Sequence, residues 1–293
     1  DVLNLLKNSW NNTSYHVYAV VAPAVSSQFQ GVKTEQVYAG IKELGFYDVV
    51  EAAIGADMVS AFEAKELAET VEEKGWKTSS CCPAFVDYVE KNYPQFVDHI
   101  STAVSPMIAI ARAIKAKDKK ARVVFVGPCT AKKVEMKREA LKDAVDIVIT
   151  FEELQAIFDA REIDLVSLEP RMAGEASSFG RNFARTGGVT ESVAHTLELS
   201  GLDLDVKAVR CNGIDECIKA MKMASFGKLD ANFIEGMACK HGCTGGAASL
   251  LHDAKGIEMI NRYGKESKTD NPLDILEKFP IDNINMERFN HED

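Results

Sequence analysis

Apolar and polar positions along the chain predict strands that alternate with helices. Residues 15–25 (YHVYAVVAPAV) form an apolar run, which predicts a buried strand that leads into a proline-containing loop. A helix is expected over residues 32–44 and a long helix over residues 47–74, where Gly75 supplies the stop signal. Two shorter helices are expected over residues 83–93 and 107–115.

The second half of the chain repeats a short strand followed by a helical pattern. The runs 122–126 (RVVFV) and 145–149 (VDIVI) begin the first two of these units. A third begins at residues 206–210 and leads into a helix over 214–223, and a fourth begins at 231–234 and leads into a cysteine-bearing segment. Alternation of this kind favours parallel sheets.

The chain length and one charged segment suggest a division into lobes. The 293 residues are enough for one two-lobed domain or two ordinary ones. The segment KAKDKKAR around Asp118 is interpreted as the joint between a first lobe, 1–118, to which the C-terminal part contributes, and a second lobe, 119–255. A polar tail over 256–293 is expected to be peripheral. Residues 167–186 are rich in Gly, Ser and Arg without periodicity, which predicts a long ordered loop that lines a site.

Charge and cysteine content narrow the classes of function. The net charge of −10 and the pI near 5.2 argue against a nucleic-acid partner, because phosphate binding requires clustered Lys and Arg. Neither a signal-peptide pattern nor an apolar run long enough to cross a bilayer is found, so we expect a cytoplasmic protein without membrane segments. Seven cysteines are an odd number in a chain too large to need disulfides, which indicates metal or redox chemistry in a reducing compartment.

Two cysteines stand four residues apart in the segment EGMACKHGCTGG. On one helical turn, Cys239 and Cys243 would lie on the same side, at a separation suited to two corners of an iron-sulfur cluster. Gly242, Gly245 and Gly246 would allow the backbone to pack against a bulky inorganic ligand and to direct N–H groups at its sulfurs. The segment therefore predicts a cluster-binding loop.

The other cysteines have unequal settings. Cys129, in VVFVGPCTAKKVE, is expected within the first turn of a helix, where the positive end of the helix dipole favours a thiolate. Cys81 and Cys82 are adjacent, and because neighbouring side chains diverge, only one of them can easily face a given metal. Cys211 and Cys217 lack such a setting and are interpreted as structural.

The residues alone leave two alternatives open. Any one of these cysteines, taken alone, is more simply a small buried hydrophobic residue. Taken together, five cysteines in three Gly- or Pro-flanked segments favour a metal site, and structural zinc competes because four thiolates are a common zinc shell. The absence of paired C-x2-C spacings argues against zinc.

Three segments resemble the signature segments of the FeFe hydrogenases, in the same order along the chain. They are TSSCCPAF (78–85), GPCTAKKVE (127–135) and EGMACKHGC (235–243). APAV (22–25) and FARTGGV (183–189) extend the resemblance to about residues 15–250. It implies an α/β fold of two lobes, each built on a mainly parallel sheet flanked by helices, with the active site in the cleft between them.

The resemblance also implies a cofactor, the H-cluster. In it a 4Fe-4S cubane is joined through a cysteine to a diiron unit that carries CO, CN and a bridging azadithiolate. Matched by motif, the cubane ligands are Cys82, Cys129, Cys239 and Cys243, and Cys243 is the thiolate shared with the diiron unit. Cys81 is the thiol that passes protons to the bridging amine.

Further positions match cofactor-binding and relay positions of the family. Lys132 is expected to donate to a cyanide of the diiron unit, and Met237 to pack beside that unit. Backbone at Ala22 and Pro23 is expected to contact the other cyanide, and Pro128 is placed with the cofactor-binding residues.

Protons must reach such a buried site through successive titratable or hydroxyl groups. The resemblance places Glu63, Glu66, Ser101 and Glu135 on a relay that leads to Cys81. From the residues alone, the two glutamates in EAKELAETVEEK are more simply a solvated helix face.

Five positions depart from the well-known hydrogen-producing enzymes. Gly127, Met107, Ala24, Phe85 and Thr70 stand where those enzymes have methionine, glutamine, serine, tryptophan and arginine. These positions surround the diiron unit or the outer relay, where contacts tune the metal's potential. The substitutions resemble the sensory branch of the family, in which a slow hydrogenase domain reports hydrogen to a signalling partner.

The first interpretation of function is reversible proton reduction, 2 H⁺ + 2 e⁻ ⇌ H₂. It implies a ferredoxin or an accessory iron-sulfur domain as electron partner, and maturation proteins that deliver the diiron unit. The sequence lacks the C-x2-C-x2-C segments that many relatives carry upstream, so we expect a shortened or naturally minimal form. The alternatives are a non-catalytic iron-sulfur protein of the hydrogenase-like cluster-assembly kind and a zinc-stabilised binding domain. Retention of Cys81, Lys132 and Met237 favours the first.

Overall fold

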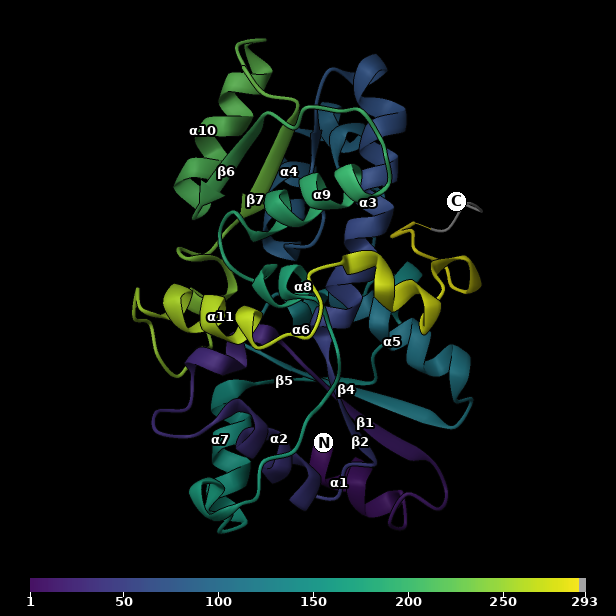
Figure 1. The fold of residues 1–293 in the computed structure, drawn as a ribbon, viewed down its shortest axis with the longest axis vertical. Helices are drawn as coiled ribbons and strands as arrows, with labels where there is room; N and C mark the ends of the chain where they lie inside the picture. The colour runs from purple at the N-terminus through teal and green to yellow at the C-terminus, as the bar shows by residue number, and fades with distance from the viewer. Residues whose placement is uncertain (290–293) are drawn as a thin grey trace.

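Two parallel β-sheets form the framework of the chain, one in each half of the view in Figure 1. The structure is a computed structural model that describes residues 1–289. Its strands are β1 (His16–Val21), β2 (Asp48–Glu51), β3 (Lys77–Thr78), β4 (Ala121–Gly127), β5 (Ile147–Thr150), β6 (Ala208–Asn212) and β7 (Phe233–Met237). The larger sheet has the order β2-β1-β4-β5 and the smaller sheet the order β3-β7-β6. All pairs of these strands are parallel, as the alternation of strands and helices predicted.

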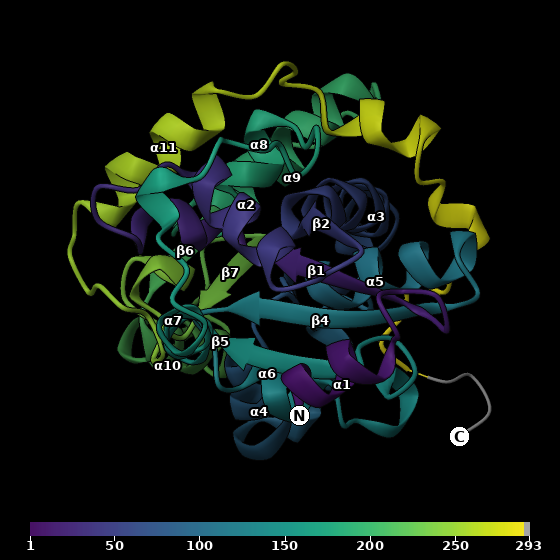
Figure 2. The same cartoon turned by 90° about the horizontal axis from the view of Figure 1, so that it is seen from below.

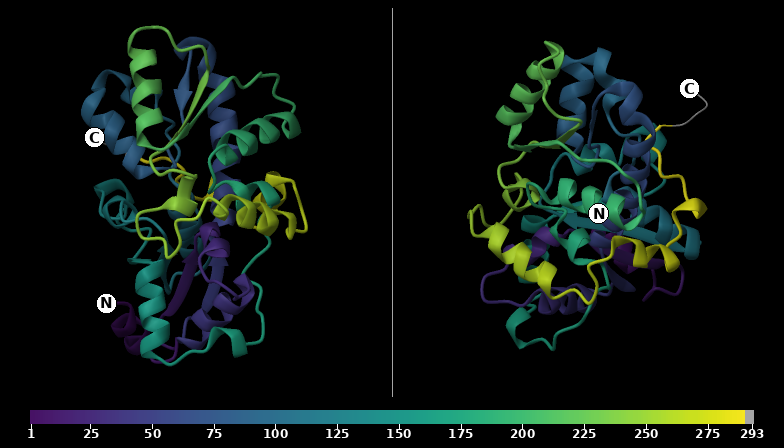
Figure 3. Two further views of the ribbon diagram at one scale, coloured as in Figure 1. Left: turned by 90° about the vertical axis from the view of Figure 1, so that its left-hand side faces the viewer. Right: turned by 45° about the horizontal axis from the view of Figure 1, so that its top comes forward.

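Helices flank both sheets, which confirms the predicted α/β fold (Figures 2 and 3). They are α1 (Val2–Asn8), α2 (Thr34–Glu43), α3 (Ala52–Lys74), α4 (Pro83–Asn92), α5 (Pro106–Lys117), α6 (Lys132–Glu135), α7 (Phe151–Ala160), α8 (Ser178–Asn182), α9 (Gly188–Leu199), α10 (Ile214–Ser225) and α11 (Gly256–Lys265). Among residues 1–289, no helix combines the length and the apolar character needed to cross a membrane.

The central strands of the larger sheet are almost wholly apolar. Val20 in β1 and Val124 in β4 are fully buried, and the register places Val20 opposite Phe125. Strands of this composition are covered on both faces, which is the usual condition of a parallel sheet. The predicted buried strands at 15–25 and 122–126 are therefore confirmed.

Helix α3 connects the two sheets and corrects one prediction. The helix expected over 47–74 is in fact strand β2 followed at once by α3, because the apolar residues Val49 and Val50 continue into an apolar helix with no breaker between them. The first nine residues of α3 are buried on every side, as in a helix at the centre of a fold. Gly75 ends the helix with a φ of 77°, as predicted.

Strand pairing contradicts the division of the chain near Asp118. Strand β4, which follows that joint, pairs with β1 over six residues, so the larger sheet combines strands from both predicted lobes. Likewise, β3 from the first predicted lobe pairs with β7 from the second. The charged segment around Asp118 is only the turn between α5 and β4, because a run of local charge carries no information on which strands pair.

Two segments, one predicted as a long ordered loop and the other as a peripheral tail, contain helices that pack into the structure. Residues 167–186 contain α8, whose Arg181 is buried and donates two hydrogen bonds of 2.8 Å to Glu51. The predicted tail begins with α11, whose Tyr263 is 3% exposed and shares a 2.7 Å hydrogen bond with Tyr38. Further on, Met286 is buried as well. Residues 290–293 of the predicted tail lie outside the described residues.

Candidate functional site

A cavity of about 90 Å³ lies where the carboxyl ends of strands from both sheets meet. Ala22 and Pro23 follow β1, Cys129 follows β4, and Cys81 and Cys82 follow β3. Ligand sites form at this edge because the connections that leave parallel strands there are free to shape a pocket. Predicted site residues that line the cavity are Ala22, Pro23, Cys81, Cys82, Pro128, Cys129, Lys132, Met237, Cys239 and Cys243.

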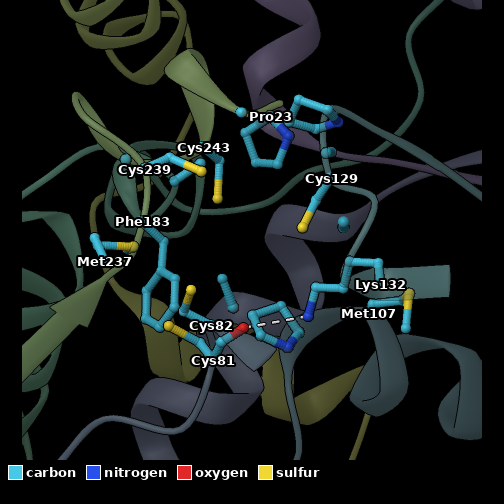
Figure 4. A pocket seen from close by; sticks show the side chains of 18 of the residues that line it. Pro23, Cys81, Cys82, Met107, Cys129, Lys132, Phe183, Met237, Cys239 and Cys243 are labelled. Carbon is cyan, nitrogen blue, oxygen red and sulfur yellow. Dashed lines mark hydrogen bonds between the residues drawn. The ribbon is translucent and has the colours of Figure 1, made fainter. Parts of the chain in front are cut away.

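Five cysteines surround this cavity in Figure 4, Cys129, Cys239 and Cys243 on one side and Cys81 and Cys82 on the other. The two adjacent cysteines diverge, as predicted: Cys81 packs with the main apolar core and Cys82 against a second apolar cluster. In contrast, Cys211 and Cys217 are fully buried and do not line the cavity.

Three cysteines have local conformations that the sequence did not predict. Cys129 precedes α6, which begins at Lys132 and is one turn long, so the helix dipole gives its thiol little support. Cys239 and Cys243 do not share a helical turn, because His241 (φ 67°) and Gly242 (φ 71°) are left-handed and reverse the chain between them. Both thiols nevertheless line the same cavity.

The glycines of this loop allow close contact with protein backbone, and Gly242 and Gly246 also line the cavity. A Cβ atom on Gly242 would lie 2.6 Å from the carbonyl oxygen of Ala184, and one on Gly246 would lie 2.5 Å from that of Pro128. The Cys243 N–H donates to the Ala184 carbonyl at 2.7 Å. The glycines therefore fix the loop against neighbouring segments and hold Cys243 in place.

Burial raises the pKa of four thiols that line the cavity. Burial and, after it, neighbouring negative charges raise the pKa of Cys81, Cys82 and Cys243. The same two causes raise the pKa of Cys239 to about 11. Backbone N–H groups act in the opposite direction, from Ala238 and Phe85 on Cys82 and from Ala247 on Cys239. Thiols placed in this way become thiolates only when a strong cation binds them.

One lysine lies in the otherwise apolar cavity wall. Lys132 is 9% exposed, and its Nζ donates to Glu135 Oε2 at 2.7 Å and to the Cys81 carbonyl oxygen at 3.2 Å (Figure 4). Burial lowers the pKa of Lys132, but the Glu135 carboxylate outweighs it and leaves the pKa raised. The lysine therefore stays charged and presents an ammonium group beside Cys81.

The donor set of this cavity fits a 4Fe-4S cluster. Four thiols reach it from three segments, and N–H groups point at the sulfurs of Cys82 and Cys239, as is usual around cluster-ligating thiolates. Within residues 1–289, no three His, Cys, Asp or Glu side chains converge closely enough to hold a single metal ion.

A second group of predicted residues lies behind Cys81. Glu63 and Glu66 are one turn apart on α3, and Ser101 donates its hydroxyl hydrogen to Glu66 Oε2 at 2.6 Å. Ser80 donates its N–H to Glu63 Oε1 at 3.1 Å. Glu63 is close enough to Cys81 to raise the pKa of that thiol, second only to burial. Both glutamates face inward, so the solvated helix face is not what the structure has.

Glu63 gives the fold a pH dependence. It is 2% exposed, its Oε2 has no hydrogen-bond partner among the described residues, and burial raises its pKa from 4.5 to about 7. Because the folded state then holds a proton that the unfolded state releases, the free energy of unfolding should fall by about 3 kcal/mol as the pH rises from 4.5 to 7. Measured by urea unfolding across this range, the free energy of unfolding of wild type should fall by about this amount relative to that of Glu63→Gln.

Residues 15–247 match the family described as iron only hydrogenase large subunit, C-terminal domain. This match covers most of the chain and includes every cysteine of the cavity. The chain belongs to this iron-only hydrogenase family.

Proteins similar to this chain include both hydrogenases and iron-sulfur cluster assembly factors. Iron hydrogenase 1 of Clostridium pasteurianum is 30% identical over 314 residues, which cover 88% of this chain and 54% of that protein. The cytosolic Fe-S cluster assembly factor NAR1 of Sclerotinia sclerotiorum is 31% identical over 172 residues, which cover 51% of this chain and 29% of that protein. This chain therefore spans about half the length of the hydrogenase it matches.

A solved structure supports the fold of the iron-only hydrogenase domain. The FeFe-hydrogenase of Chlamydomonas reinhardtii superposes with a TM-score of 0.74 at 22% identity, over 96% of this chain and 91% of that one. At this level of identity the likeness concerns the fold alone, and it agrees with the two-sheet architecture described above.

Several wall residues of this hydrogenase-family cavity were not predicted as site residues. Phe125, Phe183, Ala52 and Ala56 line it, and Met107 lies at the position where the sequence departs from its relatives. Phe183 opens the FARTGGV segment, so the motif contained a signal for it. No local pattern distinguished the others from ordinary core residues.

Gly127 explains the position of Phe125. A Cβ atom on Gly127 would lie 2.7 Å from the Phe125 ring and 3.2 Å from the Ala22 Cβ. The ring therefore fills the space that a larger residue at 127 would need. One wall of the cavity is aromatic as a result, where a methionine at 127 would place a thioether.

Proposed function

We propose that this domain holds an H-cluster and catalyses reversible reduction of protons to hydrogen. The observation that carries the proposal is the convergence of four thiols, a fifth cysteine and one buried lysine on a single cavity. Cys82, Cys129, Cys239 and Cys243 would bind the cubane, and Cys243 would also bind the diiron unit. When bound, the diiron unit supplies an iron site at which hydrogen is formed or cleaved.

The protein's own residues would orient the cofactor and exclude water from it. Lys132 is fixed by Glu135 and would present N–H donors to a cyanide ligand of the cofactor. Met237, Phe183 and Pro23 form an apolar wall, which strengthens the electrostatic effect of that single ammonium group.

Protons would be delivered to Cys81 by the residues that lie behind it, Glu63, Ser101 and Glu66. The Cys81 thiol would hold the proton nearest to the cofactor at its Sγ and would recover it from Glu63. Ser101 would connect Glu63 to Glu66, whose side chain is 10% exposed and therefore nearest to water in this group. A carboxyl group with a pKa near 7 can both accept and release a proton at neutral pH, which suits Glu63 to this task.

We also propose slow turnover, in a role of hydrogen sensing, in the cytoplasm. At the cavity wall, the Phe125 ring beside Gly127 stands in place of a methionine thioether, and the Met107 thioether stands in place of a glutamine amide. Fewer hydrogen-bond donors around the cofactor should shift its potential. Electrons would pass through the cubane to a ferredoxin or an accessory iron-sulfur domain.

Loading the protein with a synthetic diiron cofactor tests the proposal. We expect infrared bands of bound CO and CN, and measurable hydrogen production, only after loading. An iron-replete sample that shows no such bands would contradict the enzyme and favour a cluster-assembly role, as in the relatives named for that process. Turnover as fast as that of dedicated bidirectional hydrogenases would contradict the sensing role alone.

A further inference from the structure

A buried ion pair lies at the outer end of the glutamate group. Lys77, the first residue of β3, is 4% exposed, and its Nζ lies 2.8 Å from Glu66 Oε1. The two side chains are 5% and 10% exposed. Lysine is rarely buried to this extent unless its charge is paired, and Glu66 is the carboxylate that pairs it.

Three hydrogen bonds fix the Glu66 carboxylate. Besides Lys77, the Thr102 N–H donates to Oε1 at 2.9 Å, and the Ser101 hydroxyl donates to Oε2 at 2.6 Å. Thr70, one turn further along α3, donates its hydroxyl to the Glu66 backbone oxygen instead of the carboxylate. Within residues 1–289, Lys77 is therefore the one cationic side chain that donates a hydrogen bond to this carboxylate.

Two other charged groups face Glu66 and do not replace Lys77. Glu63 lies one turn away on α3 and carries a like charge when ionised. Arg288 donates its Nε to the Ser101 carbonyl oxygen and pairs with Glu90. Burial lowers the pKa of Arg288, and the carboxylates of Glu90 and Glu66 oppose this. Arg288 thus adds positive charge nearby without contacting the Glu66 carboxylate.

We propose that Lys77 is a positioning residue of the proton relay, which holds the Glu66 carboxylate turned towards Ser101. This proposal rests on the proposed function. Without Lys77, the Glu66 carboxylate would lose one of its three hydrogen bonds and would be free to turn away from Ser101. Lys77 positions Glu66 and does not carry the proton itself, because its side chain is less exposed than that of Glu66.

Substitution of Lys77 by methionine and by arginine distinguishes a residue that positions Glu66 from one that carries the proton. Lys77→Met removes the charge and should lower hydrogen turnover of the loaded enzyme about tenfold or more, most strongly on the acid side of the pH profile. Lys77→Arg keeps the charge and the hydrogen bond but cannot release a proton at working pH, so it should stay within about threefold of wild type. Lys65→Met is the matched control. Lys65 lies next to Glu66 on α3, but its side chain is 72% exposed.

A second measurement does not depend on hydrogen turnover. In protein that carries the cubane alone, the infrared carboxylate band that Glu66→Gln removes should shift in frequency in Lys77→Met, because this carboxylate loses a hydrogen bond. The band should stay near its wild-type position in Lys77→Arg. If the loaded wild type turns over and Lys77→Met has the same rate and the same infrared band, the proposed role of Lys77 is wrong. It is also wrong if Lys77→Arg is as slow as Lys77→Met. Absence of turnover in loaded wild type would instead overturn the proposed function.

Discussion

Cys81→Ala is expected to lose hydrogen turnover while it keeps the cofactor. The thiol is 8% exposed and lines the cavity. Of the five cysteines that line it, Cys81 is the one that is not a proposed cubane ligand. A positioned proton donor contributes about 10²–10⁴-fold to a rate, so we expect a loss of this size. Turnover and infrared bands should be measured on the same loaded sample, so that loss of chemistry is separated from loss of cofactor.

Cys211→Ala is the control for the Cys81 experiment. Cys211 is buried like Cys81, but it lies on β6 and does not line the cavity. Its replacement should therefore leave the rate of hydrogen turnover nearly unchanged. Normal turnover in Cys81→Ala would mean that protons reach the site without this thiol. Loss of the infrared bands would mean that Cys81 binds the cofactor.

Cys129→Ala is expected to lose the iron-sulfur cluster itself. Cys129 is the proposed cubane ligand that comes from the larger sheet, and no neighbouring thiol of that sheet lines the cavity to replace it. Replacement of a residue that only supports a metal ligand costs about 10–100-fold in metal affinity, so loss of a direct ligand should cost more. Iron and sulfide analysis of the purified variant should give values near zero, against the full content in Cys211→Ala.

Full iron and sulfide in Cys129→Ala would exclude Cys129 as a ligand. Zinc in the wild-type protein, in place of iron and sulfide, would favour the zinc-stabilised binding domain.

The sequence predicted elements well where they depend on local composition. The apolar runs at 15–25 and 122–126 became central strands, since burial on both faces leaves a continuous apolar signal. The helix predicted over 47–74 failed at its start, because Val49 and Val50 in β2 are followed directly by a helix with equally apolar residues. The joint at Asp118 failed because pairing between β1 and β4 is a long-range property.

The same distinction applies to the candidate site. The motifs identified which cysteines gather at the cavity, but not the left-handed residues that place Cys243 there. Lys77 has no motif of its own, since its role depends on Glu66 eleven residues away. Phe125 likewise gains its place only from the missing side chain at Gly127. Residues whose importance arises from a neighbour's identity leave no signal in their own segment.

The placement of the ligands across two sheets has a mechanical consequence. Cys82 and Cys239 follow strands of the smaller sheet, whereas Cys129 follows a strand of the larger one. A bound cubane would therefore act as an inorganic cross-link, which ties together segments that are far apart along the chain. Cross-links that close long loops restrict the unfolded chain most in simple polymer theory. Loss of the cluster, for example by oxidation, would thus remove a tether between the two sheets as well as an electron carrier.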